Sequence, residues 1–447
     1  MYNTKDSIVA LATTPGKSAL NVIRFSGPNV KSLLQKITFK SFAPKPNFCS
    51  LQKIFFPDSR VVLDQGVVVF FKKPKSYTGQ NLVELSVHGG SVVAKKIIKV
   101  LIGLGARQAL PGEFSYRAFV NGKIDLIQAE AVASIIETNS GLGAFYSAKN
   151  LIGGLSSSLL KIRSSVFELI TYMEYELDFV ENEIEHKSLK QYVIKIKAIQ
   201  NTVSSLLNSS FVGNEKDKDV RVCIAGKTNV GKSSLFNRLC GYEKAIVTNV
   251  AGTTRDVIEG SFSFEDMSVG LVDTAGIRGG GGKIEKIGIK KTFESIAQSD
   301  ILLFVDNKNP EAVLASLNLN LNDKDVFLIQ NKIDKYKKQK GCSLYHLSCL
   351  KNKGIDTLST DLFTSIKRKR AVFLDKKRFV VSPRVNFVLK KTLKALSDSI
   401  KKTKDTKELV VVVSSLYVAL DFLSEASAPI SKDEVINKIF GDFCVGK

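Results

Sequence analysis

Hydrophobic and polar positions alternate in short runs through the first part of the chain. Gly and Pro pairs, such as Pro15-Gly16 and Gly89-Gly90, separate the runs as turns do. The runs are rich in β-branched and aromatic residues, and they predict strands at Ile8–Ala12, Ala19–Phe25, Val61–Phe71 and Leu82–Val87. After Ser91 the apolar residues fall at helical spacing, which predicts a helix. Residues 1–120 are therefore expected to form a small α+β domain.

The hydrophobic period changes to about 3.6 residues from Lys123 onward. An apolar stripe runs from Ile124 to Ile136 at this spacing, and the pattern continues through Leu159–Leu177 and Tyr192–Leu207. Helical patterning returns after Arg370 and lasts to the end of the sequence. These stretches predict an all-α domain.

The helical stretches are interrupted by a region of different character. The polar segment Gly213–Asp219 is expected to be a linker, and alternating strands and helices follow it. The expected organisation is an α/β domain at residues 216–370, inserted between the helical segments 121–215 and 371–447. The predicted fold class is thus an N-terminal α+β domain, a discontinuous all-α domain and an inserted α/β domain.

A phosphate-binding motif opens the α/β domain. The apolar strand Val220–Ala225 runs into Gly226-Lys227-Thr228-Asn229-Val230-Gly231-Lys232-Ser233-Ser234, a full Walker A match at the start of a helix. Its glycines let successive backbone N–H groups turn toward a phosphate at the helix N-terminus. Lys232 is expected to reach the β- and γ-phosphates, and Ser233 is expected to bind Mg²⁺.

Further motifs follow in the order of a GTPase. The strand Val269–Val272 ends at Asp273, a carboxylate for Mg²⁺, followed by Thr274-Ala275-Gly276. After the strand Val326–Gln330 comes Asn331-Lys332-Ile333-Asp334, whose carboxylate can accept two guanine N–H groups that adenine lacks. Ser348-Cys349-Leu350 stands where a backbone N–H would meet the guanine carbonyl.

The stretch between the two phosphate motifs is interpreted as switch I. It contains Gly252-Thr253-Thr254-Arg255-Asp256, with Thr254 as the second Mg²⁺ ligand. Ile277 stands where many GTPases have a water-orienting glutamine, so another group must do that work. The predicted GTP-binding residues are Asn229, Val230, Gly231, Lys232, Ser233, Ser234, Thr248, Asn249, Val250, Ala251, Gly252, Thr253, Thr254, Asp273, Thr274, Ala275, Gly276, Asn331, Lys332, Asp334, Ser348, Cys349 and Leu350.

Composition adds a possible partner and a compartment. The formal net charge is +22 with a pI near 9.5, which fits a polyanionic partner such as RNA or, equally, a lysine-rich solvated surface. The six cysteines lack paired spacing and are expected to be reduced thiols. No signal-peptide pattern opens the sequence, and the apolar run Leu409–Leu420 is too short to cross a bilayer. A cytoplasmic protein with no membrane association is expected.

Motifs outside the α/β domain narrow the interpretation to one family. Inside the α/β domain the distinguishing features are Asn229, the Ala251–Asp256 segment and the missing glutamine. Outside it, the motifs are Thr14-Pro15-Gly16, Arg24–Pro28, Ser76–Gly79, His88-Gly89-Gly90, Pro111–Phe114, Asn121–Glu130 and the Cys444-Val445-Gly446-Lys447 ending. In these features, and over nearly its whole length, the chain resembles the MnmE (TrmE) family of tRNA-modification GTPases, which are potassium-dependent.

The resemblance implies a three-part molecule with defined partners. It implies an N-terminal tetrahydrofolate-binding and dimerising domain, a split helical domain and an inserted Ras-like G domain. It also implies a homodimer that joins an FAD-dependent MnmG flavoprotein in a heterotetramer. Together they would add a carboxymethylaminomethyl or aminomethyl group to carbon five of the tRNA wobble uridine, using a 5-formyl or 5,10-methylene folate.

Individual residues follow from the resemblance by motif. Arg24, Glu84, Lys123 and Lys447 would bind the folate, and Glu285 would position the attacking water. A K⁺ ion would be held by Asn229, Thr248, Val250 and Thr253. Cys444, the fourth residue from the end of the sequence and close to Gly446-Lys447, is assigned to a functional site with its chemical role open.

The chain departs from the family pattern at several places. Lys17-Ser18 and Gln80-Asn81 replace residues of the folate region, and Cys349 replaces an alanine of the guanine loop. The run Gly279–Gly282 replaces a polar, acidic part of switch II. Leu409–Val413 favours a strand by propensity, whereas the family has a helix there, and we expect the helix because tertiary context overrides such propensity.

Two other functions are considered. One is a ribosome-assembly GTPase of the Era or Der type, which would leave the long N-terminal portion without a role and would call for a KH domain with a G-x-x-G clamp after Arg370, where none stands. The other is a degenerate scaffold, which the intact Lys232, Ser233, Asp273 and Asp334 argue against. The folate species, the amine, the tRNAs and the host are left open by the sequence.

Overall fold

The computed structural model shows a chain with two compact units. It describes residues 3–38, 41–59, 61–138, 141–178, 189–212, 220–241, 245–248, 258–264, 267–273, 292–339, 344–376, 379–405, 408–427, 440–441, 443 and 446. One unit contains residues 1–133, 149–204 and 387–447, and the other contains residues 134–148 and 205–386. Each unit is discontinuous in sequence, because the chain leaves the first unit twice and returns to it.

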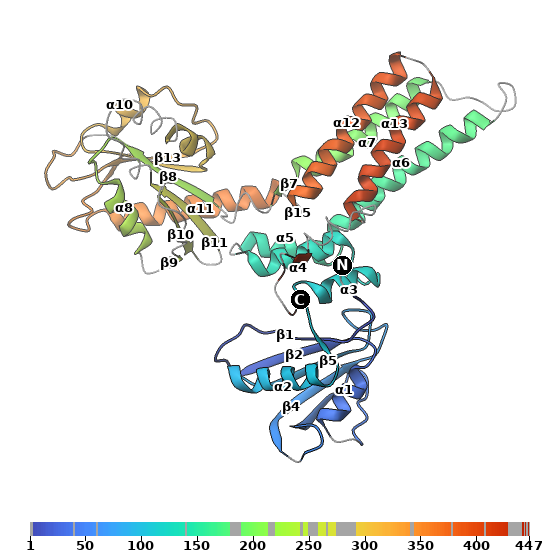
Figure 1. The fold of residues 1–447 in the computed structure, drawn as a ribbon. Coiled ribbons are helices and arrows are strands. Elements are labelled where there is room, and N and C mark those ends of the chain that lie inside the picture. The colour runs from blue at the N-terminus through green and yellow to red at the C-terminus, as the bar shows by residue number, and fades with distance from the viewer. Residues whose placement is uncertain are drawn as a thin grey trace, which may run out of the picture. The chain divides into compact units, whose positions relative to one another are not determined.

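The N-terminal part of the first unit is built on one mixed sheet (Figure 1). Its strand order is β3-β4-β5-β2-β1-β6, antiparallel except for the β1–β6 pair. The strands and helices are β1 (Ile8–Leu11), β2 (Leu20–Ser26), α1 (Val30–Ile37), β3 (Cys49–Phe55), β4 (Val62–Phe71), β5 (Leu82–His88), α2 (Ser91–Gly103), β6 (Arg107–Gln108) and α3 (Glu113–Val120). The four strands and the helix predicted from the sequence are all present, and α1, β3, β6 and α3 are additional elements.

The two faces of this sheet bury different residues. Because side chains alternate along a strand, Val9 packs with α1 and α2 on one face, while Ile8 and Ala10 pack with Phe114 of α3 on the other. Figure 1 shows α1 and α2 on the same side of the sheet. The face carrying α3 is the one near Tyr77, and it is important for the second site described below.

Buried charges hold α3 against the N-terminal segment. Arg117, which is fully buried, donates from Nη2 to Asp6 at 2.6 Å and to Glu113 at 2.9 Å. Arg107 also bonds both Asp6 and Glu113. Gln80 completes the cluster: its Oε1 accepts from Arg117, and its Nε2 donates to the backbone of Thr4. The amide of Gln80 therefore uses both a donor and an acceptor, which a carboxylate at this position could not do.

The long helices of the helical part are α6 (Gly154–Asp178), α7 (Leu189–Asn208), α12 (Pro383–Asp405) and α13 (Leu409–Ser427), and they run side by side in Figure 1. Gln200 of α7 donates to Ser397 of α12, and Arg163 of α6 donates to Ser424 of α13, so α7 borders α12 and α6 borders α13. Pro383 opens α12, where a proline costs no helical hydrogen bond. The shorter helices α4 (Leu126–Glu137) and α5 (Gly141–Leu151) precede α6 in the sequence.

The strand-like sequence Leu409–Val413 is helical, as we expected from the family. By length and composition alone, the window Leu409–Ala426 of α13 is long and apolar enough to cross a membrane, whereas the apolar run Leu409–Leu420 considered in the sequence is shorter than a membrane span. The helix is longer than the run because Phe422, Leu423 and Ala426 extend its apolar face. In the structure 44% of that window is buried, and Tyr417 bonds Glu174 of α6.

The second unit is centred on a seven-stranded sheet of order β14-β13-β12-β8-β11-β10-β9. The five strands from β14 to β11 are parallel. At one edge, β10 pairs antiparallel with β11 on one side and with β9 on the other. Its elements are β8 (Val220–Gly226), α8 (Lys232–Cys240), β9 (Ala245–Thr248), β10 (Ile258–Phe264), β11 (Met267–Asp273), β12 (Ile301–Asp306), α10 (Pro310–Ala315), β13 (Asp325–Gln330), β14 (Leu344–His346) and α11 (Ile355–Lys376).

Helices cover both faces of this sheet. On one face, residues of α8 and α11 such as Leu235 and Leu362 pack on Val222 and Leu303. On the other face, Ile296 and residues of α10 pack on Cys223, Leu302 and Phe304. The arrangement is a doubly wound α/β sheet, in which the carboxyl ends of the central parallel strands form the ligand-binding edge.

A two-stranded parallel pair lies outside the main sheet of the second unit. β7 (Ser210–Val212) pairs with β15 (Phe379–Val381), residues that stand before and after the α/β sheet in the sequence. Tyr146 of α5 packs its ring edge-on to Phe211, with centroids 5.5 Å apart, and Val380 joins the same cluster. The predicted boundary at residue 370 falls inside α11, and the proposed domain boundaries stay predictions.

Candidate functional site

The Walker A segment leaves the central strand β8 and enters helix α8. Gly226 and Gly231 have φ of 146° and 96°, the left-handed region where a side chain is strained. A Cβ on Gly226 would lie 2.0 Å from the backbone oxygen of Val305, so only glycine fits between β8 and β12. The N-terminus of α8 therefore lies at the carboxyl edge of the sheet, and the first turn of a helix, whose N–H groups have no partner within the helix, suits an anion.

The side chain of Lys232 folds back onto the phosphate loop that precedes it in the sequence. Its Nζ donates to the backbone oxygens of Gly226 at 2.8 Å and Lys227 at 2.6 Å, and the residue is only 5% exposed. A buried ammonium needs such partners, because an unpaired charge in a low-dielectric site is costly. Phosphate oxygens arriving at the loop would meet a cation that is already positioned.

Asn331 joins the phosphate loop to the base-binding motif. Its Nδ2 donates to the backbone oxygen of Val230 at 2.9 Å, and its Oδ1 accepts from the backbone N–H of Cys349 at 3.4 Å. The neighbouring Lys332 donates from Nζ to the oxygen of Asn229 at 2.5 Å. Three loops that are separate in sequence are thus tied together by one buried amide and one lysine.

Asp334 has the geometry of a base-reading carboxylate. Ser348 donates from Oγ to Asp334 Oδ1 at 2.6 Å, and this hydrogen bond is the main cause that lowers the pKa of Asp334. The carboxylate is therefore ionised at neutral pH and keeps acceptor positions for two N–H donors. Burial raises the pKa of the neighbouring Cys349 thiol, so that side chain is a small neutral group, while Leu350 is 79% exposed.

The structure brings together part of the predicted nucleotide site. Asn229 to Ser234 lie at the start of α8, close to Asn331, Lys332, Asp334 and the Ser348–Leu350 loop. Thr248 and Asp273 are placed by their backbones at the ends of β9 and β11, and Asp273 pairs in register with Ile224 of β8. Predicted residues outside the described part of the chain are Asn249, Val250, Ala251, Gly252, Thr253, Thr254, Thr274, Ala275, Gly276, Gly279–Gly282, Glu285 and Cys444.

One residue that contacts this site could not be identified from the sequence motifs. Arg238 of α8 donates from Nε to the backbone oxygen of Cys349 at 3.2 Å, which joins the helix of the phosphate loop to the guanine loop. Nothing in the motif spacing singles it out, because it stands on a helix face with ordinary polar neighbours. Its contact appears only when the two loops meet in the fold.

A second cluster of predicted residues lies in the N-terminal part of the first unit. Arg24 of β2 stands in register with Glu84 of β5, and its Nη2 lies 2.6 Å from Glu84 Oε1. The guanidinium is 5.6 Å from the ring centroid of Tyr77 and 5.7 Å from that of Phe114, and it donates to the oxygen of Gly446 at 3.4 Å. An ion pair edged by two aromatic rings suits a planar ligand that carries charge and hydrogen-bonding groups.

Lys123 borders this cluster. The residue is exposed, and its Cγ would lie 3.3 Å from a Cβ placed on Gly79, two residues after Tyr77. Burial raises the pKa of Tyr77, so its phenol is neutral and donates to or accepts from Ser115 at 2.8 Å. The sequence did not single out Tyr77 or Phe114 as site residues, although both lie within the motifs that carry the family resemblance. Lys447 falls beyond the described residues.

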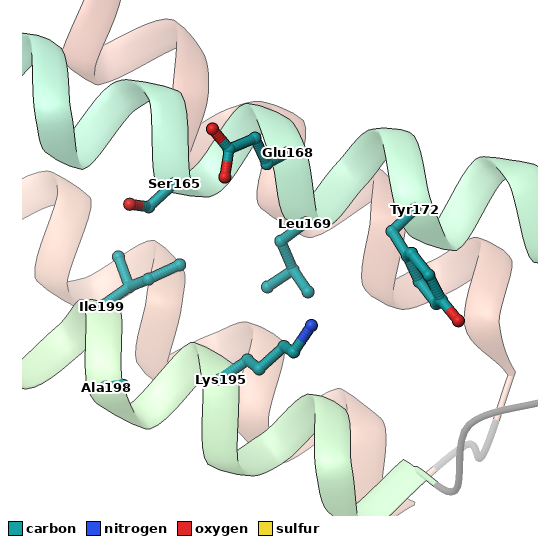
Figure 2. A pocket seen from close by; sticks show the side chains of 7 residues that line it. All are labelled: Ser165, Glu168, Leu169, Tyr172, Lys195, Ala198 and Ile199. Carbon is teal, nitrogen blue, oxygen red and sulfur yellow. The ribbon is translucent and has the colours of Figure 1, made fainter.

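The helical part has a separate groove of about 410 Å³ between α6 and α7. Figure 2 shows Glu168 and Tyr172 on α6 and Lys195 on α7, whose Nζ is 5.4 Å from the Tyr172 ring centroid. The lining residues are Ser165, Glu168, Leu169, Tyr172, Lys195, Ala198 and Ile199. None of them was predicted as a GTP or folate ligand, so the groove is distinct from both sites.

Solved structures of G domains resemble part of the chain. The G domain of the FeoB iron transporter of T. maritima is 24% identical, with a TM-score of 0.24 over 35% of this chain and 98% of that one. Era of Aquifex aeolicus is 24% identical, with a TM-score of 0.26 over 40% of this chain and 67% of that one. Likenesses at these scores add no support, and the fold assignment rests on the sheet itself and on the family matches.

Family models and curated relatives match nearly the whole chain. Residues 7–123 match the model of the GTP-binding protein TrmE N-terminus, and residues 126–444 match that of the MnmE helical domain. The tRNA modification GTPase MnmE of Aquifex aeolicus is 34% identical over 99% of this chain and the whole relative. That of Nitrosomonas eutropha is 35% identical over 99% of both chains. The chain therefore belongs to the MnmE family of tRNA modification GTPases, which confirms the predicted family, fold class and enzyme class.

Proposed function

We propose that this chain is a K⁺-dependent GTPase that takes part in wobble-uridine modification of tRNA with a flavoprotein of the MnmG type. The pair would add a carboxymethylaminomethyl or aminomethyl group to carbon five of the uridine. The observation that carries the proposal is the buried Asn331 amide, which joins the phosphate loop to the guanine loop in a chain aligned end to end with tRNA modification GTPases. An ionised Asp334 beside this link supports guanine as the base.

The phosphate end of the site suits GTP with Mg²⁺. Lys232 would exchange its two backbone acceptors for β- and γ-phosphate oxygens. Ser233 and Thr254 would bind Mg²⁺ with help from the carboxylate of Asp273, a set of hard oxygen ligands of the kind this ion prefers. The metal would neutralise charge on the phosphates. Asn229, Thr248, Val250 and Thr253 would hold K⁺, and Glu285 would position the water.

The cluster around Arg24 suits a tetrahydrofolate derivative. Tyr77 and Phe114 would flank a planar ring, while Arg24 and Glu84 offer donors and an acceptor to it. Lys123 and Lys447 would meet the anionic tail of the ligand. The folate would supply the one-carbon unit, either as the 5-formyl or as the 5,10-methylene species, and Cys444 is proposed to belong to this site.

The proposed assembly is a homodimer that joins the flavoprotein in a heterotetramer and acts on tRNA in the cytoplasm. We propose residues 1–120 as the folate-binding and dimerising domain and 216–370 as the G domain. Residues 121–215 and 371–447 would form the split helical domain. No observation favours the alternative, a ribosome-assembly GTPase of the Era or Der type.

Mass spectrometry of wobble nucleosides tests the proposal. Deletion of the gene is expected to remove the modified uridine, and the full-length chain is expected to restore it, whereas Lys232→Met is not. A matched Lys353→Met variant, altered at an exposed lysine of the same unit, should restore the modification. An unchanged nucleoside profile combined with immature ribosomal subunits would favour the ribosome-assembly alternative instead.

A further inference from the structure

The helical bundle has two sides of opposite charge. Helix α7 and the part of α12 from Phe387 to Asp405 together carry nine lysines and only two carboxylates, Asp398 and Asp405. Helices α6 and α13 carry Lys161 and Arg163 against six carboxylates. Since α7 borders α12 and α6 borders α13, the charges are segregated in space as well as in sequence.

The groove in Figure 2 lies at the boundary between the two sides. There Glu168 lies on α6, and the side chain of Lys195 on α7 points toward Tyr172 of α6. The contrast within one bundle shows that the positive side is not merely a result of a lysine-rich composition. A uniform lysine excess would place cations on all four helices.

Helix α12 has the densest part of the positive side. Lys390, Lys391 and Lys394 stand three, four and seven residues after Phe387, so all four share one face of the helix, and Lys401 continues it two turns later. The opposite face, with Leu389, Thr392 and Leu396, is buried in the bundle. The lysines from 390 to 404 span roughly 20 Å at the helical rise per residue.

Four lysines along α12 have no anionic partner in the described part of the chain. Among the residues that the structure describes, Lys390, Lys394, Lys401 and Lys404 have no carboxylate within ion-pair distance. Lys391 instead lies over aromatic rings, 4.5 Å from the centroid of Phe387 and 5.2 Å from that of Phe422. Phe387 itself is 58% exposed, so its ring is accessible to a ligand beside these cations.

We propose that the exposed face of α12, formed by Phe387, Lys390, Lys391, Lys394 and Lys401, binds the phosphate backbone of the tRNA substrate. A row of cations on a rigid helix complements a polyanion, and phosphate contacts set the position of an RNA. The exposed ring of Phe387 offers a surface for stacking an unpaired base. The inference rests on the proposed function for the identity of the RNA.

An anionic membrane is the other polyanionic surface to consider. A helix that lies in a membrane surface inserts its apolar face among the lipids. On α12 that face is occupied, because Leu389 and Leu396 are fully buried against the bundle. Lipid binding would have the charges and one exposed ring but no apolar face to insert, whereas an RNA matches the row of charges with its phosphates and the ring with a base. The structure therefore favours RNA.

Binding of the full-length protein to tRNA over a range of KCl concentrations tests the inference. The variant Lys390→Gln/Lys394→Gln/Lys401→Gln is compared with Lys95→Gln/Lys96→Gln/Lys99→Gln, which removes the same charge from exposed positions of α2. Loss of three phosphate contacts should lower the slope of log K against log salt by about 2 to 3 and weaken binding at least about tenfold near physiological salt. The α2 variant should behave as wild type, and GTP hydrolysis should be unchanged in both.

Each other outcome has a defined meaning. If both triple variants weaken tRNA binding equally, net charge and not the α12 face would explain the loss. That result would overturn the inference and leave the proposed function intact. If the wild-type protein binds no tRNA and does not change the wobble nucleosides, the proposed function itself is contradicted.

Binding to vesicles of phosphatidylcholine with phosphatidylserine is measured in parallel. If the α12 variant loses vesicle binding but keeps tRNA binding, the face binds lipid and the inference is overturned. The single variant Phe387→Ala should weaken binding without changing the salt slope.

Discussion

Ser348 Oγ lies 2.6 Å from Asp334 Oδ1 and donates a hydrogen bond to it. The bond fixes the carboxylate of one loop against the hydroxyl of another, and Ser348 is itself buried. Because the hydroxyl uses one lone-pair position, the remaining positions of the carboxylate stay available to a base. The contact thus sets both the charge and the orientation of Asp334 before any nucleotide arrives.

We expect Asp334→Asn to change the preferred base from guanine to xanthine. The amide presents a donor where the carboxylate accepted, so the guanine N–H pair loses an acceptor and the xanthine oxygen gains a donor. Competition between GTP and XTP for the full-length protein measures the change. Asp361→Asn, at a carboxylate that accepts from Tyr345 outside the site, is the control. An unaltered preference for GTP would remove Asp334 from the base site.

Gly231→Ala is expected to abolish high-affinity nucleotide binding. A Cβ there would lie 2.3 Å from Asn331 Nδ2, and the residue has a φ of 96°. The added atom would push away the amide that bridges the phosphate and guanine loops, with a loss of GTP affinity of about tenfold or more. Equilibrium binding of a fluorescent GTP analogue measures it. Gly103→Ala, with no atom within 4 Å of the new Cβ, should bind normally.

GTP hydrolysis should require K⁺ and be accompanied by dimerisation of G domains. A cation between the phosphates can replace an arginine finger, which is worth about 10³–10⁵ in rate. Single-turnover rates in matched KCl and NaCl, for wild type, Asn229→Ala and Glu285→Ala, measure this. Asn229→Ala should lose K⁺ stimulation, and Glu285→Ala should dimerise but hydrolyse slowly. Equal rates in both salts would refute the cation mechanism.

Arg24→Gln should weaken binding of 5-formyltetrahydrofolate by about tenfold or more, because it leaves Glu84 unpaired and removes the cation beside Tyr77 and Phe114. Isothermal titration of the full-length protein gives the affinity. Lys53→Gln, at an exposed residue of the same sheet, removes the same charge and should have no effect. If both variants bind equally well, the folate site lies elsewhere.

Asp6→Asn should destabilise the N-terminal sheet at neutral pH and not in acid. Burial raises the pKa of Asp6, but hydrogen bonds and charges from Arg107 and Arg117 outweigh it and lower the pKa below its usual 3.8. The ion pairs therefore stabilise the fold above that value, and the stabilisation is lost as the pH falls through the lowered pKa. The loss at pH 7 should be about 2 kcal/mol, since Asp6 is 27% exposed.

Hydrogen exchange of β1 and α3 in the full-length protein measures this loss. Protection in Asp6→Asn should be reduced at pH 7 and should approach that of wild type below about pH 3.8. Asp58→Asn, at an exposed turn, is the control and should leave protection unchanged. A difference of constant size at every pH would show that the carboxylate charge is not responsible.

Much of the fold could be predicted because its signals are local. Strands β4 and β5 have β-branched alternation, and the Walker A loop is specified by glycines whose φ values the structure shows to be positive. Helix α13 is the opposite case, since Leu409–Val413 has strand propensity and becomes helical only through its packing on α6. Strand β3 was missed because it is largely exposed, so its sequence lacks a clear hydrophobic alternation.

In the candidate sites too, some residues are indicated by local motifs and others are recognised only in the folded structure. Lys232 and Asp334 could be named from motifs, because phosphate and guanine recognition need fixed residue types at fixed spacing. The bridge from Asn331 to Val230, the contact of Arg238 with Cys349 and the rings around Arg24 depend on segments that meet only in the folded chain. No pattern within a single segment could have indicated them.

The parallel pairing of β7 with β15 bears on how such a chain could arise. Ser210 pairs with Phe379 and Val212 with Val381, so the segment leading into the α/β sheet and the segment leaving it lie next to each other. The gap from Val212 to Phe379 is roughly 8 Å by strand spacing, which a linker of about three residues can cross. An ancestral helical protein could therefore have acquired the G domain in a single insertion, without moving any of its own elements, and the same junction should accept other domains whose two ends lie close together.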